Sequence, residues 1–159
     1  MDKEYFQDYI HGNVCFGCGK DNPDGLQIKS YWEGEDAVCI WVSKPMYQGR
    51  EKVLNGGVLA TLIDCHCMDT AMAAAYRAEE RALGTTPHYR FATATISVRY
   101  LKPTPNDRPI ELRAQVASLK GRKAKLTCDV LVDGIKTAEA EAVGVQVLKG
   151  GPEEDNLLR

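Results

Sequence analysis

The longest pattern in the chain is a run of apolar residues at helical spacing from about Gly56 to Arg81. The apolar positions make a wide stripe, which predicts a helix that is covered on most of its sides. The stripe includes Val58, Leu59, Leu62, Ile63, Cys67, Ala71, Met72, Ala74 and Ala75. Asp64 lies among these residues, where a charge is rare.

Alternating apolar and polar residues predict strands on both sides of this helix. The expected strands are residues 26–33, 37–43, 93–101, 110–119, 123–132 and 135–148. Asp133-Gly134 between two of them is a strong hairpin signal. Residues 44–55 are too polar for a core and are expected to form a loop.

Two strands, a long helix and four further strands predict an α+β fold, in which an antiparallel sheet of five to six strands wraps the central helix. The length of 159 residues suits one domain and is too short for two. We expect an irregular lead-in over 1–25, a single domain over 26–148 and a flexible tail over 149–159.

The composition excludes several classes of partner. The hydrophobic fraction of 44% is that of a globular protein, and the net charge of −2 gives no sign of a nucleic acid or membrane partner. No apolar run approaches the ~20 residues that span a bilayer. The first residues, Met1 to Tyr5, lack the apolar stretch of a secretory signal. We therefore expect a cytoplasmic protein.

Cys15 and Cys18 form a C-x-x-C motif, while the other four cysteines lie in predicted strands or in the helix. A zinc site needs four ligands, and no second C-x-x-C follows. His11 is a candidate third ligand, with no obvious fourth. A tight glycine-rich turn is the favoured interpretation, with structural zinc or redox chemistry as alternatives, and we expect no metal and no cofactor in the function.

The start of the predicted helix carries the candidate chemistry. Gly56 and Gly57 open the helix, where backbone N–H groups lack intrahelical partners and attract an anion or a polarised carbonyl oxygen. Asp64 is a candidate general base or nucleophile. The alternatives are that the glycines only allow a close approach of the chain, and that Asp64 is a structural carboxylate.

Helix geometry has a consequence for assembly. Gly56 and Asp64 are eight residues apart, which is ~12 Å along a helix axis. Reacting atoms must come within ~3–3.5 Å of one another, so these two residues of one chain cannot act on the same carbonyl. The donor and the carboxylate of one site should come from two subunits of a two-fold dimer.

Three signatures in this order resemble the hotdog-fold thioesterases, specifically the phenylacetate-degradation-type (PaaI-like) acyl-CoA thioesterases. They are Cys15-Phe16-Gly17-Cys18-Gly19 with Asn22-Pro23-Asp24-Gly25-Leu26; Tyr47-Gln48-Gly49 with the stretch from Leu54 to Asp64; and Arg99-Tyr100-Leu101-Lys102-Pro103 with Gly121-Arg122-Lys123 and Asp133-Gly134. The resemblance covers about residues 13–148. Where the family has a histidine before the two glycines, this chain has Asn55.

The resemblance implies an enzyme that hydrolyses an acyl-CoA thioester to a free acid and CoA, without a cofactor, as a homodimer or a dimer of dimers (a homotetramer). Catalysis would fall to Asp64, Gly56 and Asn55. Substrate binding would fall to Gln48, Gly57, Thr93, Arg122 and Lys123, with Thr95 as an alternative to Thr93 and the two cations holding the phosphates of CoA.

Three other functions stay open at this point. Asn55 in place of histidine favours a non-catalytic acyl-CoA-binding protein of the same fold. A hotdog dehydratase or hydratase would need a histidine, and the helix offers His66, which does not share the face of Asp64. The third alternative is a zinc-binding or redox module built on Cys15 and Cys18.

Overall fold

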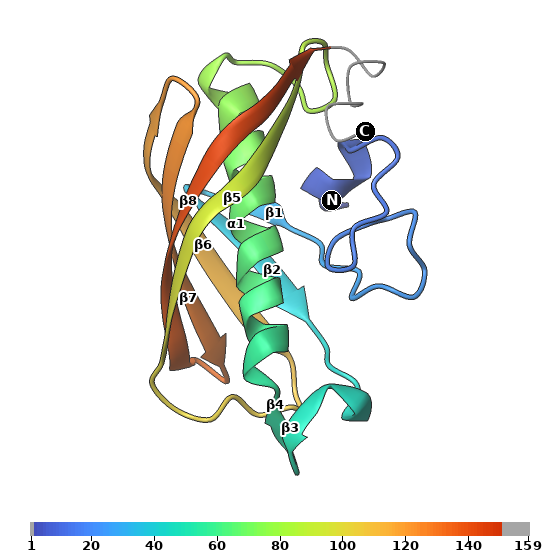
Figure 1. Cartoon of the computed structure of the whole chain (residues 1–159), viewed down its shortest axis with the longest axis vertical. Coiled ribbons are helices and arrows are strands. Elements are labelled where there is room, and N and C mark those ends of the chain that lie inside the picture. Colours follow the sequence, from blue (N-terminus) through green and yellow to red (C-terminus); the bar gives the residue numbers. More distant parts are fainter. Residues whose placement is uncertain (1, 151–159) are drawn as a thin grey trace.

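In the computed structural model, which describes residues 2–150 and the side chains of 2–147, one long helix lies against a curved antiparallel sheet (Figure 1). The helix is α1 (Gly56–Ala78). The strands are β1 (Tyr31–Glu33), β2 (Asp36–Trp41), β5 (His88–Tyr100), β6 (Ile110–Lys120), β7 (Lys123–Val132) and β8 (Ile135–Gly150), in the sheet order β1-β2-β6-β7-β8-β5. The predicted α+β layout, with a central helix and a sheet of five to six strands, is confirmed.

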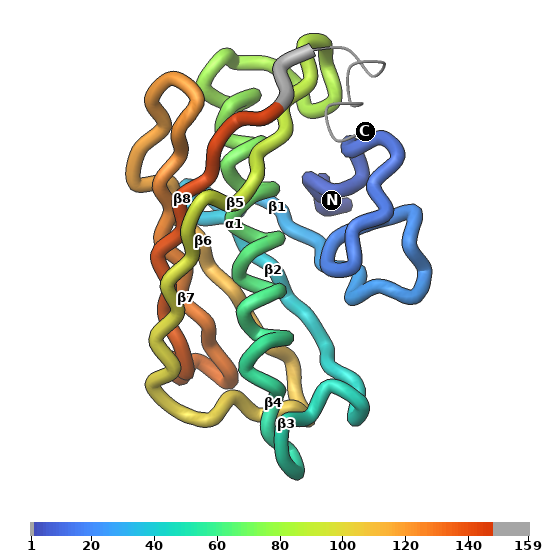
Figure 2. The backbone as a smooth tube through the Cα atoms, viewed as in Figure 1, coloured from blue at the N-terminus to red at the C-terminus, as the bar shows by residue number. Residues whose placement is uncertain are grey.

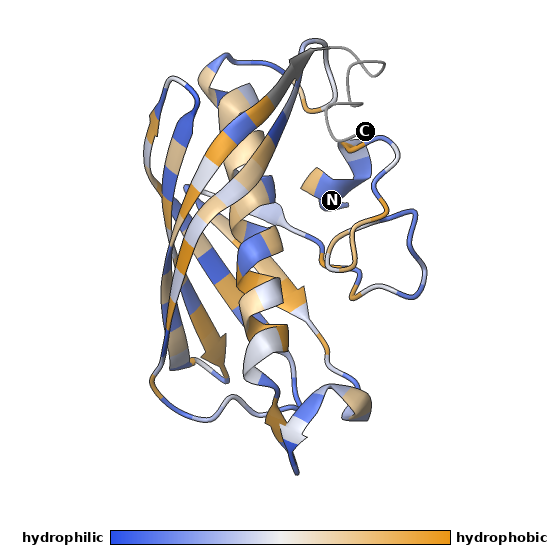
Figure 3. Ribbon diagram, in the orientation of Figure 1, coloured by the Kyte–Doolittle hydropathy of each residue, from blue (hydrophilic) through white to orange (hydrophobic). Residues whose placement is uncertain are grey.

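Helix α1 is covered on two sides, as its wide apolar stripe predicted. The sheet packs on one side, and the N-terminal segment lies along the side away from the sheet (Figure 2). Most of α1 is coloured as hydrophobic, whereas orange and blue alternate along the strands (Figure 3). In β7 this alternation buries every second residue from Ala124 to Val132.

The turns follow the sequence signals closely. Asp133 and Gly134 both have positive φ values, 51° and 76°, which is the backbone of a type I′ hairpin between β7 and β8. The helix ends at Ala78, three residues before the predicted end, with Glu79 as its C-cap.

Several element boundaries differ from the prediction. Residues 26–30 are not in the sheet, because their backbone pairs with the N-terminal segment instead; Phe6 N–H donates to Ser30 O at 2.8 Å and Ile28 N–H to Gly17 O at 3.1 Å. The predicted loop 44–55 contains a 3₁₀ turn, η2 (Pro45–Tyr47), and a small hairpin of β3 (Gln48–Arg50) and β4 (Val53–Leu54). Strand β5 begins five residues earlier than predicted.

The ends of the chain also depart from the prediction where the structure describes them. The lead-in contains a 3₁₀ turn, η1 (Phe6–Tyr9), and the Phe6 side chain is fully buried in the core. Of the tail predicted over 149–159, residues 149 and 150 continue the backbone of β8, and 151–159 lie outside the described residues.

By length and hydropathy alone, α1 is sufficient to cross a membrane, so the expectation that no segment approaches that length was wrong. Within this fold, 67% of its most apolar window is buried. A core helix of a globular protein passes the same test, because a helix covered on both sides needs apolar residues all round. The feature is therefore weak evidence for a membrane span.

A buried polar network joins the N-terminal segment to α1. His66 Nε2 lies 3.1 Å from Ala37 O, and because a carbonyl can only accept, Nε2 carries the proton and Nδ1 accepts from Ser30 Oγ at 2.8 Å. Gln7 Nε2 donates to Ser30 Oγ and to Asp69 Oδ2 at 3.0 and 2.9 Å. Burial lowers the pKa of His66 to about 4 and raises that of Asp69 to about 6. His66 is thus a core histidine, and Asp69 is a buried structural carboxylate.

Candidate active site

Asp64 and Thr93 meet where α1 crosses β5. The Thr93 hydroxyl donates a hydrogen bond to Asp64 Oδ1. Asp64 is half-buried and Thr93 is exposed in the single chain, so this carboxylate is reachable from solvent. The structure thus brings these two predicted site residues together, although Asp64 is less buried than its apolar sequence context suggested.

The backbone of the sheet explains why Thr93, rather than Thr95, faces the carboxylate. A bulge lies between them, since Thr93 pairs with Gly144 and Thr95 with Val143. The extra residue breaks the alternation that made both threonines candidates, and bulges commonly re-aim a side chain in this way.

Gly144 is a site residue that the sequence argument missed. A Cβ at this position would lie 2.8 Å from the sulfur of Met68, which is one helical turn after Asp64. The glycine therefore lets α1 approach the sheet at the level of Thr93. A single glycine inside a predicted strand is the signal that marks such a close approach.

The start of α1 presents one open backbone donor. Asn55 is the N-cap, and its Oδ1 accepts from the N–H groups of Gly57 and Val58 at 2.8 and 3.1 Å. Leu59 N–H donates to Asn55 O at 3.1 Å. Among the hydrogen bonds of residues 2–150, none uses the N–H of Gly56. This is the donor predicted for the oxyanion, whereas Gly57 N–H is engaged by the cap.

A groove of about 340 Å³ opens at this helix start. Its walls are mostly apolar, with Leu59 and Tyr100 beside Gly56, and the cations Arg50 and Lys102 at its edge. The Tyr100 hydroxyl donates to Gly56 O at 2.7 Å. This volume is within the range of small-molecule sites. A second groove, near the C-terminal end of α1 at Arg77, contains none of the predicted site residues.

The remaining predicted residues lie apart from these two centres. Gln48 stabilises its own loop through two hydrogen bonds: its Nε2 donates to Pro45 O, and its Oε1 accepts from Lys52 N–H. Arg122 donates to Gln146 O at 3.1 Å through Nε and at 2.7 Å through Nη2.

The hairpin tip between β6 and β7, which carries Arg122 and Lys123, lies at the same level of the sheet as Thr93. Lys123 pairs with Val145, which pairs with Ala92, the neighbour of Thr93. Two strand spacings of about 4.8 Å separate Lys123 from Ala92. Lys123 is exposed and alternates with the buried Ala124, so its side chain faces the outside of the sheet.

The N-cap geometry makes a prediction about stability. Asn55→Ala should lower the free energy of unfolding by about 1 kcal/mol, because two helix N–H groups lose their acceptor. Asn55→Ser, which restores a capping oxygen without the amide, should recover most of the loss. Urea denaturation of the three proteins measures this. Equal stabilities for the alanine and serine variants would contradict a capping role.

A buried helix crossed by a curved antiparallel sheet, with a carboxylate on the helix and an open donor at its start, defines the hotdog class of α+β proteins. The model of the thioesterase superfamily matches residues 51–139, more than half of the chain and the part that holds Gly56, Asp64 and Thr93. The chain therefore belongs to the thioesterase superfamily, as its sequence motifs predicted.

Individual relatives agree with this assignment. Over 119 residues the chain is 29% identical to the acyl-coenzyme A thioesterase THEM4 of Bos taurus, covering 75% of this chain and 43% of that protein. The chain thus spans less than half the length of that relative. A thioesterase superfamily protein from Shewanella loihica PV-4 is 31% identical, with a TM-score of 0.62 over 74% of this chain and 89% of that one.

The likeness to PaaI lies in the fold. The PaaI protein of E. coli, from the phenylacetic acid degradation operon, superposes with a TM-score of 0.64 over 79% of this chain and 83% of that one, at 12% identity. The three signatures in the sequence thus led to the right superfamily and the right fold.

Proposed function

We propose that the protein hydrolyses acyl-CoA thioesters at a site made of Asp64 and Thr93 from one subunit and the Gly56 N–H of the partner subunit. The observation that carries this proposal is the pairing of an accessible carboxylate, oriented by a hydroxyl, with a helix start whose first N–H has no partner among residues 2–150. Membership of the thioesterase superfamily and the name of the bovine relative support thioester chemistry.

Each residue has a distinct task in the reaction. Asp64 either takes a proton from the attacking water or attacks the thioester carbon itself to form an anhydride that water then opens. The carbonyl oxygen gains negative charge, which the Gly56 N–H and the positive end of α1 stabilise. When Asp64 acts as a base, the C–S bond then breaks, the proton taken up by Asp64 passes to the sulfur, and CoA leaves as its thiol together with the free acid. When Asp64 acts as a nucleophile, CoA leaves first and takes its proton from solvent, and water then opens the anhydride to release the acid.

The positions of these groups along α1 suit a two-fold axis near the middle of the segment between them. Gly56 and Asp64 are placed symmetrically about Ala60, a small and half-buried residue. Two antiparallel copies of α1 that meet at Ala60 would bring Gly56 of each next to Asp64 of the other. Such an axis makes two equal sites from two incomplete ones.

Strand β5 supports the same axis independently. It forms one edge of the sheet, and Ala92 to Thr95 are exposed although they lie in the middle of the strand. A long, exposed edge strand commonly needs a partner. Antiparallel pairing of two β5 strands about the point between Ile96 and Ser97 would place Thr93 opposite Tyr100, which lies against Gly56.

The groove and the basic hairpin supply a place for the rest of the substrate. The groove beside Gly56 offers apolar walls to an acyl chain, with Arg50 and Lys102 at its edge. Arg122 and Lys123 are the proposed partners of the CoA phosphates, since guanidinium and ammonium groups suit phosphate. A cytoplasmic location is part of the proposal.

The test is incubation of the protein with acyl-CoAs of increasing chain length and with aryl-CoAs. Free CoA and free acid should appear together in equal amounts, and chromatography is preferable to a thiol reagent because the six cysteines are free thiols. Saturable binding of acyl-CoA without release of CoA would instead identify a non-catalytic binding protein, the function that Asn55 favours.

A hydratase or dehydratase based on His66 is not supported. Both ring nitrogens of His66 are used inside the core, and the ring is completely buried. It therefore has no route to a substrate held at Asp64.

The hydroxyl of Thr93 provides a further prediction. Thr93→Val should lower kcat/KM about 10–100-fold, because a hydrogen bond to a charged group contributes ~1.5–3 kcal/mol. Thr93→Ser should retain most of the activity. Thr95→Val is the matched control, since Thr95 is exposed on the same strand beyond the bulge. Equal losses in Thr93→Val and Thr95→Val would refute the positioning role of Thr93.

A further inference from the structure

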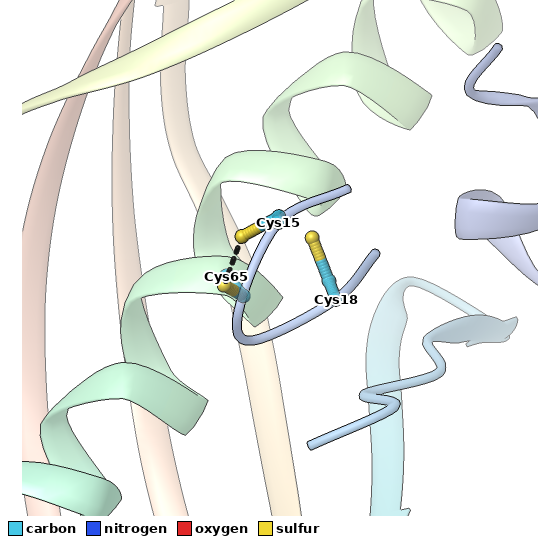
Figure 4. A group of neighbouring side chains, drawn as sticks. All are labelled: Cys15, Cys18 and Cys65. Carbon is cyan, nitrogen blue, oxygen red and sulfur yellow. Dashed lines mark hydrogen bonds between the residues drawn. The ribbon is translucent and has the colours of Figure 1, made fainter. Parts of the chain in front are cut away.

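Three cysteines meet where the N-terminal segment crosses α1. Cys15 and Cys18 come from the C-x-x-C turn and Cys65 from the helix, and their sulfur atoms all lie within 4.8 Å of one another (Figure 4). The Sγ atoms of Cys15 and Cys65 are 3.8 Å apart. Cys65, the residue after Asp64, thus supplies a third thiol, which the sequence around the C-x-x-C motif did not offer.

Two glycines allow the turn to close over the helix. A Cβ at Gly17 would lie 2.4 Å from the sulfur of Cys65, and a Cβ at Gly19 would lie 2.4 Å from the backbone nitrogen of Cys15. Gly19 N–H donates to Cys15 O at 2.9 Å. A side chain at either position would clash with these atoms, move the turn away from α1 and separate the sulfurs. The two glycines therefore allow the three sulfurs to lie close together.

Polar groups point at two of the sulfurs. Gly17 N–H points at Cys15 Sγ at 3.4 Å, and Asn13 Nδ2 donates to Cys18 Sγ at 3.6 Å. The thiolate is the form of cysteine that binds metal.

A carboxylate lies beside the three sulfurs, where it accepts a hydrogen bond from Gln7 and would have to turn toward them to join the group. Asp69 is one helical turn after Cys65, on the same face of α1, and it is buried. Its carboxyl group interacts with the thiol of Cys18. His11, the candidate third ligand in the sequence, does not take part, because its ring stacks on His88 at a centroid distance of 5.5 Å.

We propose that Cys15, Cys18 and Cys65 bind a zinc ion as three thiolate ligands, with the Asp69 carboxylate as the fourth. Tetrahedral zinc with Zn–S bonds of ~2.3 Å holds its sulfurs ~3.8 Å apart. The Cys15–Cys65 pair has this separation, and the other sulfurs need to move by about 1 Å or less.

A disulfide accounts less well for the same group. It would join two of the sulfurs at ~2.05 Å and leave the third thiol without a role. A divalent cation uses all four side chains and offsets the charge of a buried carboxylate among thiolates.

The four protein ligands close the coordination shell, which is typical of a structural site. The ion would link the N-terminal segment, whose Phe6 and Leu26 are buried in the core, to α1. The link would be at Cys65, the residue after Asp64. Its role would be to stabilise the fold around the site rather than to act on the substrate.

The test is metal binding by the whole chain under reducing conditions. After treatment with a chelator, the protein should bind one equivalent of Zn²⁺, and Co²⁺ in its place should give the absorption of a tetrahedral cobalt–thiolate centre. Cys65→Ala should weaken zinc binding by more than the 10–100-fold that loss of a second-shell partner costs. Cys67→Ala, two residues along the same helix, is the matched control and should bind as wild type does.

Two further variants test the other proposed zinc ligands. Cys15→Ser changes an exposed residue of the turn and should lose zinc even if a helix variant folds poorly. Asp69→Asn should keep one equivalent with weaker affinity, and unchanged affinity would remove Asp69 from the site. Absence of stoichiometric zinc in the reduced protein, or equal binding by Cys65→Ala and Cys67→Ala, would overturn the proposal. A Cys15–Cys18 disulfide as the sole stable state would do the same.

Discussion

Asp64→Asn should lower kcat/KM for acyl-CoA hydrolysis by about 10²–10⁴-fold, the usual contribution of a general base. Asparagine has the same shape and can still accept the hydrogen bond from Thr93, so the fold should change little. It can neither take a proton from water nor form an anhydride. Acyl-CoA binding should persist, which would place the loss in kcat rather than in KM.

The control for this variant is Asp129→Asn. Asp129 is a half-buried carboxylate on β7, away from the helix, where it pairs with Lys136 at 3.0 Å. Its substitution removes the same charge and should leave kcat/KM unchanged. Full activity in Asp64→Asn, or an equal loss in both variants, would show that Asp64 does not carry the chemistry.

The fold was predictable because its main signals are local. The wide apolar stripe of α1 reports a helix that is covered on most sides, and the alternation in β7 reports which face of the strand is buried. The Asp133-Gly134 turn fixes a hairpin through its own backbone preference. Residues 26–30 were misassigned for the opposite reason. Their apolar alternation is real, but they bury it against the N-terminal segment instead of joining the sheet, and this choice depends on distant parts of the chain.

The site was predictable in part, for related reasons. A helix start with two glycines and a carboxylate inside an apolar stripe are visible in the sequence, and so is the ~12 Å between them, because helix geometry is fixed. The bulge that selects Thr93 and the close approach at Gly144 depend on sheet register, which no local pattern encodes. Cys65 could not be joined to Cys15 and Cys18, because 47 residues separate it from Cys18 in the chain.

Gly56→Pro should reduce kcat/KM about 10²–10³-fold, because it removes the one N–H proposed to hold the oxyanion. Proline is well tolerated at the first position of a helix, where the N–H has no intrahelical partner. Asn55 precedes it with φ −60° and ψ 132°, a conformation that a following proline accepts. The helix should therefore survive the change.

Gly56→Ala is the matched variant for this test. It retains the N–H, and its Cβ would lie 3.5 Å from the ring of Tyr100, an ordinary contact. Its activity should stay close to that of wild type. If the proline and alanine variants lose activity equally, the space beside Tyr100 matters and the N–H does not.

Mixing the two inactive variants tests the shared site directly. A hybrid of a Gly56→Pro subunit and an Asp64→Asn subunit has one site with both defects and one with an intact Gly56 facing an intact Asp64. Random exchange makes half of the dimers hybrids, so the mixture should recover about a quarter of wild-type activity. Sites built within single subunits would give no recovery, because every such site would carry one defect. Recovery of activity would therefore establish both the dimer and the division of the catalytic groups between its subunits.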